Sequence, residues 1–128
     1  MEEKVKQKNP GRKDCEGDQC GEYLMAIRDS IEVINGKWKA PIVVSLLFGN
    51  KRFNELERDI QGITPKMLSK ELRDLEINHL VKRTVYDTIP VTVEYSLTDY
   101  GKTLRKVINA LREWGLEHRR EILKKKKG

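Results

Sequence analysis

Three cations and a hydroxyl recur at helical spacing near the middle of this 128-residue chain, and they could bind a polyanion. The set is Lys66, Ser69, Lys70 and Arg73. A helix would place them on one face, because side chains three and four residues apart are neighbours. That face lies opposite three apolar side chains, Leu68, Leu72 and Leu75, and we expect it to be free of acids. The pattern fits a helix in the major groove of DNA; the alternative is a solvated helix face.

Residues that could catalyse a reaction or hold a metal are scarce by comparison. The two histidines, His79 and His118, have no recognisable partner for acid–base catalysis. We find no nucleophile elbow, no phosphate-binding glycine loop and no metal-ligand cluster in the sequence. The chain is therefore expected to have no enzymatic activity, no catalytic residues, no cofactor and no metal.

The helix that carries the cations has a well-marked start and a helical neighbour. Thr64 and Pro65 are typical of an N-cap followed by the first helical position, and the free N–H groups of such a first turn favour an anion. Both residues therefore join the candidate DNA-binding set. The preceding helix is expected at 53–60, three residues away across a link that contains Gly62. Two helices joined in this way predict a helix-turn-helix.

The elements on either side complete a recognisable outline. Apolar residues at threes and fours predict helices at about 23–34 and 39–48, and a final helix that Thr98 or Asp99 could cap. Between 81 and 97 the apolar period changes to two on either side of a turn at 87–90, which predicts a β-hairpin. The fold class is therefore mainly α with a small β-hairpin wing, a winged helix-turn-helix. The wing would bring Lys82, Arg83 and Thr84 to flanking DNA.

Composition and charge set the wider limits. The length suits one domain, expected at 21–118, between a polar flexible leader at 1–20 and a basic tail at 119–128. The net charge is +6, with about as many acids as bases in the leader and an excess of bases in the tail. Neither a signal peptide nor an apolar run long enough to cross a bilayer is visible, so we expect a cytoplasmic protein with no membrane partner.

Several short motifs occur together, in order, and resemble a known family. They are Asn35-Gly36-Lys37-Trp38-Lys39, Arg52-Phe53-Asn54-Glu55-Leu56, Gly62-Ile63-Thr64-Pro65-Lys66-Met67-Leu68-Ser69, Leu72-Arg73-Asp74-Leu75-Glu76 and Val93-Glu94-Tyr95-Ser96-Leu97-Thr98. Over about residues 22–118 the chain resembles the HxlR-type winged helix-turn-helix regulators of bacteria, which are related in architecture to MarR proteins. The resemblance implies a transcriptional regulator that binds double-stranded DNA as a homodimer, on a near-palindromic operator.

The resemblance also implies which helices form the dimer and how a signal could enter. The terminal helices would dimerise through an apolar set comprising Tyr23, Leu24, Ile27, Leu104, Val107, Ile108, Leu111 and Trp114. Some members sense oxidants through a cysteine ahead of the first helix, where this chain has Cys15 and Cys20. Nearby acids disfavour a reactive thiolate here, so unreactive thiols, a disulfide within the chain and a disulfide between subunits all stay open. A small-molecule inducer is the other candidate signal.

Other functions fit the residues less well. A winged helix could dock on another protein without specific DNA binding, but acidic residues on the cationic face would favour that alternative, and none is expected there. Binding of single-stranded RNA usually needs aromatic side chains on which bases stack. Aromatic residues make up 6% of this chain, and most of them are assigned to the core.

Overall fold

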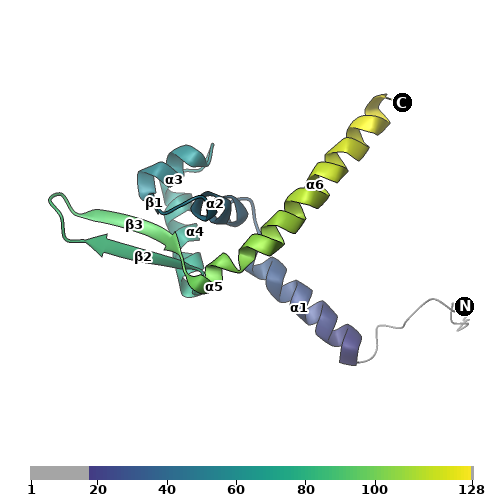
Figure 1. The fold of residues 1–128 in the computed structure, drawn as a ribbon, viewed down its shortest axis with the longest axis horizontal. Helices are drawn as coiled ribbons and strands as arrows, with labels where there is room; N and C mark the ends of the chain where they lie inside the picture. The colour runs from purple at the N-terminus through teal and green to yellow at the C-terminus, as the bar shows by residue number, and fades with distance from the viewer. Residues whose placement is uncertain (1–17, 128) are drawn as a thin grey trace, which may run out of the picture. The chain divides into compact units, whose positions relative to one another are not determined.

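The computed structural model describes residues 18–127, with side chains described for 19–125. Its elements divide between two units, residues 1–32 and 33–128, which we describe separately. Helix α1 (Asp18–Ile34) makes up the described part of the first unit and ends just inside the second. The second unit contains all other elements (Figure 1), namely α2 (Lys39–Leu47), β1 (Lys51–Arg52), α3 (Phe53–Asp59), α4 (Pro65–Ile77), β2 (Val81–Tyr86), β3 (Thr92–Leu97), α5 (Asp99–Lys102) and α6 (Leu104–Lys127).

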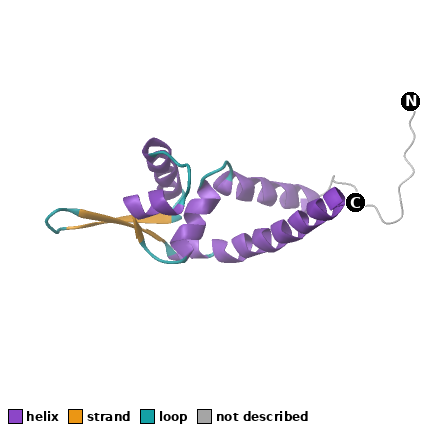
Figure 2. Cartoon of the chain, turned by 90° about the horizontal axis from the view of Figure 1, so that it is seen from above, coloured by secondary structure: helices purple, strands orange, loops and turns teal. Residues whose placement is uncertain are grey.

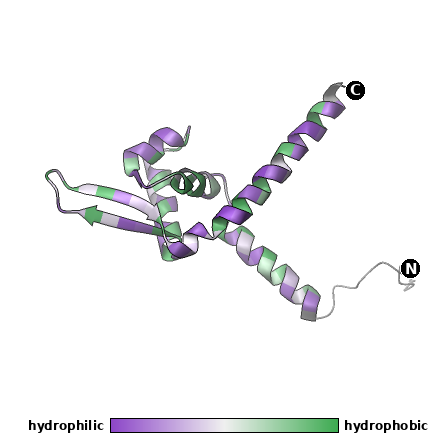
Figure 3. Cartoon of the chain, viewed as in Figure 1, coloured by the Kyte–Doolittle hydropathy of each residue, from purple (hydrophilic) through white to green (hydrophobic). Residues whose placement is uncertain are grey.

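The core of the second unit forms where α2, α3 and α4 bring their apolar faces together. Helix α2 is apolar over most of its surface (Figure 3) and contributes the fully buried Ile42 and Val43. Helix α3 adds Leu56, which is also completely buried. Helix α4 buries the three leucines that its sequence predicts, at 0% to 1% exposure: Leu68, Leu72 and Leu75. The predicted rotation of α4 about its axis is therefore confirmed.

The turn between α3 and α4 follows the local sequence closely. Gly62 has a φ of +92°, a conformation that glycine adopts without the strain of a Cβ atom. Thr64 is the N-cap of α4, and its hydroxyl accepts a hydrogen bond of 3.2 Å from the backbone N–H of Met67. Pro65 occupies the first turn, where its missing N–H costs nothing. These local choices fix where α4 begins and confirm the predicted helix-turn-helix.

The wing is a three-stranded antiparallel sheet in the order β1-β3-β2. Its two longer strands form the orange hairpin in Figure 2. The predicted hairpin is confirmed, with Val81 opposite Leu97 at its base and Tyr86 opposite Thr92 near its tip. Strand β1 was not expected from the sequence. It pairs Lys51 with Tyr95 and spans two residues, too few to show an alternating pattern. The architecture is a winged helix-turn-helix.

The two ends of the described chain differ from the sequence-based expectation. Helix α1 begins at Asp18, inside the segment 1–20 that was expected to be a flexible leader. Helix α6 continues to Lys127, through the expected tail at 119–128. Lysine, arginine, glutamate and leucine dominate this last stretch, and all of them favour the helical state even where little is buried.

The final helix is also divided in two. Thr98 is the N-cap of α5, as its sequence position predicts, and its hydroxyl accepts a 2.8 Å hydrogen bond from the N–H of Gly101. Gly101 packs so closely on the backbone carbonyl of Leu80 that any Cβ atom would collide with it. Thr103 caps α5 before α6 begins. The packing of α5 on the start of the wing therefore requires glycine at 101, which local sequence does not reveal.

The end of α4 contains a residue in a strained conformation. His79 adopts a φ of +62°, the left-handed region that a side chain with a Cβ atom disfavours. Its N–H donates to the carbonyl of Glu76 at 2.9 Å, and the next N–H, of Leu80, donates to Leu75 at 3.0 Å. This pair of bonds is the Schellman arrangement, in which glycine is the usual residue.

We expect His79→Gly to raise the free energy of unfolding by about 0.5 to 1 kcal/mol, because the relief of strain exceeds the extra entropy that glycine gains in the unfolded chain. Urea denaturation at neutral pH measures the change. His79→Ala is the matched control, since it removes the imidazole but keeps the Cβ atom, and it should give no gain. Equal gains in both variants would place the effect in the imidazole instead of the backbone.

Candidate nucleic-acid interface

The outer face of α4 carries the side chains that the sequence predicts to bind DNA. Lys66, Ser69, Lys70 and Arg73 are all exposed, on the side of the helix away from its buried leucines. Thr64 and Pro65 are exposed at the start of the helix. A helix with an exposed N-terminal half and a cationic outer face has the shape and charge to enter a major groove.

One expectation about this face is wrong, because an acid does reach it. The Lys70 ammonium lies 3.5 Å from Oδ2 of Asp74, one turn further along α4. Asp74 lies between the cationic face and the buried face, so a helical wheel shows it as a border residue. The Lys70 side chain is 70% exposed, and an exposed pair at this separation contributes little to stability. Lys70 is therefore held loosely.

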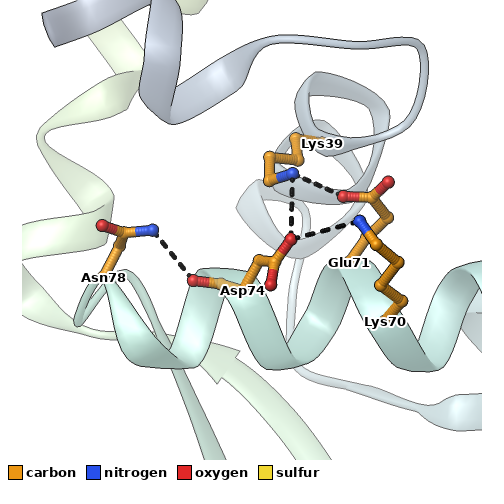
Figure 4. Close-up of polar contacts among 5 residues, drawn as sticks. All are labelled: Lys39, Lys70, Glu71, Asp74 and Asn78. Atoms are coloured by element: carbon orange, nitrogen blue, oxygen red, sulfur yellow. Dashed lines mark hydrogen bonds and ion pairs between the residues drawn. The ribbon is translucent and has the colours of Figure 1, made fainter.

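Asp74 belongs to a polar cluster that links α4 to α2 (Figure 4). Lys39, the first residue of α2, is 9% exposed, and its ammonium donates to Oε1 of Glu71 at 2.6 Å and to Oδ2 of Asp74 at 3.4 Å. The sequence interpretation missed these contacts. A lysine at the start of an otherwise apolar helix was the available signal, but the sequence does not say which helix it faces.

The cluster shifts the pKa values of its members in the directions that ion pairs produce. Partial burial lowers the pKa of Lys39, but hydrogen bonding and attraction from Glu71 and then Asp74 outweigh burial and raise it above 10.5. Partial burial likewise raises the pKa of Asp74, and the contacts with Lys39 and then Lys70 bring it below 3.8. Lys39 and Asp74 are therefore both charged at neutral pH.

A second polar cluster fixes α3 against α2 and β1. The Asp59 carboxylate accepts hydrogen bonds of 2.7 Å from the Ser45 hydroxyl and from the Lys51 ammonium. The hydrogen bond from Lys51, followed by that from Ser45, lowers the pKa of Asp59. Because these residues come from α2, β1 and α3, the cluster ties the first helix of the helix-turn-helix to the wing. Sequence interpretation missed it too.

The wing places its cations near its base. Lys82 and Arg83 are exposed on β2, opposite Ser96 and Tyr95, while Thr84 is half-buried. The turn beyond them carries Asp87 and the fully exposed Ile89. The predicted wing residues therefore lie on the part of the hairpin next to the helical core, and the tip offers an apolar side chain instead of a positive one.

The expected dimer residues fall into two groups. On α6, Leu104 and Ile108 pack against the core of their own chain, and Val107 is half-buried, whereas Leu111 is 51% and Trp114 67% exposed. On α1, described by itself, an apolar group is exposed: Tyr23, Leu24 and Ile27. The first turns of α6 thus serve the core, and the uncovered apolar surface begins at Leu111.

Of the two cysteines, the structure describes only Cys20. Cys20, in the first turn of α1, is disulfide-bonded. Cys15 lies outside the described residues.

Comparison with known proteins identifies the family of this chain. The family model described as HxlR-like helix-turn-helix matches residues 33–122. The chain belongs to the HxlR-like family. An uncharacterised HTH-type transcriptional regulator of Bacillus subtilis, YtcD, is 42% identical over 96 residues, covering 75% of this chain and 76% of YtcD. An uncharacterised HTH-type regulator of Methanothermobacter thermautotrophicus is 42% identical over 108 residues, covering 83% of this chain and 82% of its own.

A solved structure has a similar fold. The redox regulator HypR in its reduced form is similar with a TM-score of 0.72 and 41% sequence identity, over 78% of this chain and 98% of that chain. In the part of this HxlR-like chain that the structure describes, no helix is both long enough and apolar enough to span a membrane.

The lowered pKa of Asp74 predicts how acid affects stability. A carboxyl with a lower pKa in the folded protein stabilises it above the unfolded value, and this contribution disappears as the pH falls through the folded value. We therefore expect the stability difference between wild type and Asp74→Asn to be largest near neutral pH and to shrink as the pH falls from about 4 towards 2. Urea titrations across this range measure it.

The matched control is Asp87→Asn, which removes an exposed carboxylate at the hairpin turn. Its difference from wild type should stay small at every pH. A difference for Asp74→Asn that does not change down to pH 2, roughly the limit of the titration, would contradict the role of the charged pair.

Proposed function

We propose that this protein is a transcriptional regulator that binds double-stranded DNA in a sequence-specific way through α4. The observation that carries the proposal is the outer face of α4, where Lys66, Lys70 and Arg73 are exposed together opposite a fully buried leucine face. Membership of the HxlR-like helix-turn-helix family and the names of the transcriptional regulators it resembles support it. The outer face of α4 would lie in the major groove, and the wing would reach flanking phosphates through Lys82 and Arg83.

The cations of α4 differ in whether they suit contacts with bases or with phosphates. Arg73 has the planar guanidinium that can bind the O6 and N7 atoms of guanine together, so we assign it to base recognition. Lys66 and Lys70 are better suited to phosphates or to single acceptors, because their ammonium groups are point charges. Ser69 lies between them on the same helix and can donate or accept a hydrogen bond.

We further propose that the protein acts as a homodimer on a near-palindromic site. Exposed apolar side chains on α6 support this: Leu111, Trp114, Leu116, Ile122 and Leu123. Exposed apolar residues on α1, considered separately, add to the surface that a second copy could cover. A single winged helix with a few cations binds DNA weakly, whereas two linked copies bind more tightly because the second contact becomes intramolecular. Two recognition helices in successive major grooves would lie about 34 to 36 Å apart.

Two signals are compatible with the chain. The disulfide at Cys20 and the similarity to the redox regulator HypR support an oxidant. A groove of about 780 Å³ between α2 and α6, with Trp38, Val44, Phe48 and Leu111 in its lining, supports a small apolar inducer. In either case the signal would act on the spacing or the population of DNA-binding dimers.

Selection from a random duplex library at about 150 mM salt tests the proposal, because non-specific binding to phosphates weakens at that salt while base recognition survives. We expect an enriched inverted repeat. Running the selection with a thiol reductant and again after diamide treatment tests the redox signal, which predicts enrichment in one state and not in the other. Failure to enrich any sequence in either state, with a folded protein, would favour docking on another protein.

Replacement of Arg73 by alanine tests how the sequence is read. If Arg73 binds guanine, the variant should lose about 1 to 3 kcal/mol of binding free energy and its preference at one base-pair position. Lys106→Ala is the control, since it also removes one positive charge, from an exposed site on the side of α6 away from its apolar residues. An equal loss on all sequences would make Arg73 a phosphate contact.

A further inference from the structure

Lys39 is the one charged side chain among the described residues that the core buries, and it faces α4. Removing an ammonium group from water is costly, and an apolar residue of the same length would usually stabilise such a site equally well. The Lys39 ammonium instead contacts Glu71 at 2.6 Å and Asp74 at 3.4 Å. The charge of Lys39 is therefore paired with two acids of α4, the helix that we propose binds DNA.

Those acids matter because they balance the cations of α4. The helix carries three cations, Lys66, Lys70 and Arg73, and three acids, Glu71, Asp74 and Glu76. Its outer face is positive because Glu71 and Asp74 are drawn towards α2, where their side chains are 16% and 37% exposed. Without a cation on α2, the charges of both carboxylates would be unpaired on a helix that must approach phosphates, and like charges repel.

Asp74 is the critical member, because two lysines share one of its oxygens. Oδ2 lies 3.4 Å from the ammonium of Lys39 and 3.5 Å from that of Lys70 (Figure 4). The Lys39 side chain is 11% exposed and stays where it is, whereas that of Lys70 is 70% exposed and free to leave. When Lys70 moves to a phosphate, Asp74 keeps a cationic partner in Lys39.

We propose that Lys39 is a positioning residue for DNA binding, which holds Asp74 so that Lys70 can leave that carboxylate for the DNA. The inference rests on the proposed function of α4 and assigns a role in binding to a lysine whose side chain is only 11% exposed. Lys39 touches no nucleic acid itself. Its effect passes through one carboxylate to one lysine, so it should appear as the gain or loss of a single phosphate contact.

The experiment measures DNA affinity against salt concentration, because each phosphate contact adds about one to the slope of log affinity against log salt. The probe is the duplex enriched by the selection or, if none is enriched, a random duplex of about 30 base pairs. We expect Lys39→Met to weaken binding about tenfold and to lower the magnitude of the slope by about one, because Asp74 then retains Lys70.

Two double variants with the net charge of the wild type separate this role from a general charge effect. Lys39→Met with Asp74→Asn removes the carboxylate that retains Lys70, and should restore both the affinity and the slope. Lys39→Met with Glu71→Gln leaves Asp74 in place, and should restore neither. Equal behaviour of the two double variants, or a wild-type slope for Lys39→Met, would overturn the inference.

Two further measurements keep the test independent of folding and of the proposed function. Thermal unfolding of each variant without DNA sets a temperature at which all are folded, and Lys39→Arg, which keeps the charge, should bind with the wild-type slope. The single variant Asp74→Asn should bind any duplex at least as tightly as the wild type. If the wild type itself shows no salt-dependent binding, the proposed function fails. If the wild type binds and Lys39→Met binds identically, the inference about Lys39 alone fails.

Discussion

The rotation of α4 about its own axis is the constraint on which the rest of the structure depends. Leu68, Leu72 and Leu75 are at most 1% exposed, and they fit one face of the helix and no other. A shift of one residue turns a helix by about 100°, which would bring Arg73 in one direction, or Glu71 and Asp74 in the other, into the core and the leucines into water. Burial of three leucines therefore fixes the direction of every cation on the opposite side.

The buried leucines set the orientation of α4, and electrostatic contacts set the charge of its outer face. The apolar face determines which side of α4 points outward, but α4 carries as many acids as bases, so this alone does not make the outer side positive. The buried ammonium on α2 draws two of the acids inward, and a second cluster, around Asp59, ties α3 and β1 to α2. The helix-turn-helix is thus held by one apolar contact surface and by two polar clusters that orient its parts.

The sequence predicts the features that are local and misses those that depend on a distant partner. The start of α4 follows from Thr64, Pro65 and Gly62, and the buried face of α4 follows from the spacing of its leucines. The packing of α5 depends instead on the close approach of Gly101 to the carbonyl of Leu80, and β1 exists only because β3 pairs with it. A helical wheel could predict the contact of Lys70 with Asp74, but the contact of Asp74 with Lys39 could not be predicted without knowing where α2 lies. The DNA contacts and the dimer surface remain proposals.

The sheet order has a consequence for solubility. In the order β1-β3-β2, strand β2 is an outer strand of six residues, and its free edge could pair with a strand of another molecule. Lys82 and Arg83 are consecutive on that strand, so their side chains point to opposite faces of the sheet, and both are exposed. Charged side chains, lysine above all, disfavour such edge-to-edge association because a second copy would bring like charges together. The same two cations that we assign to DNA would therefore also protect the wing from aggregation whenever the protein is free.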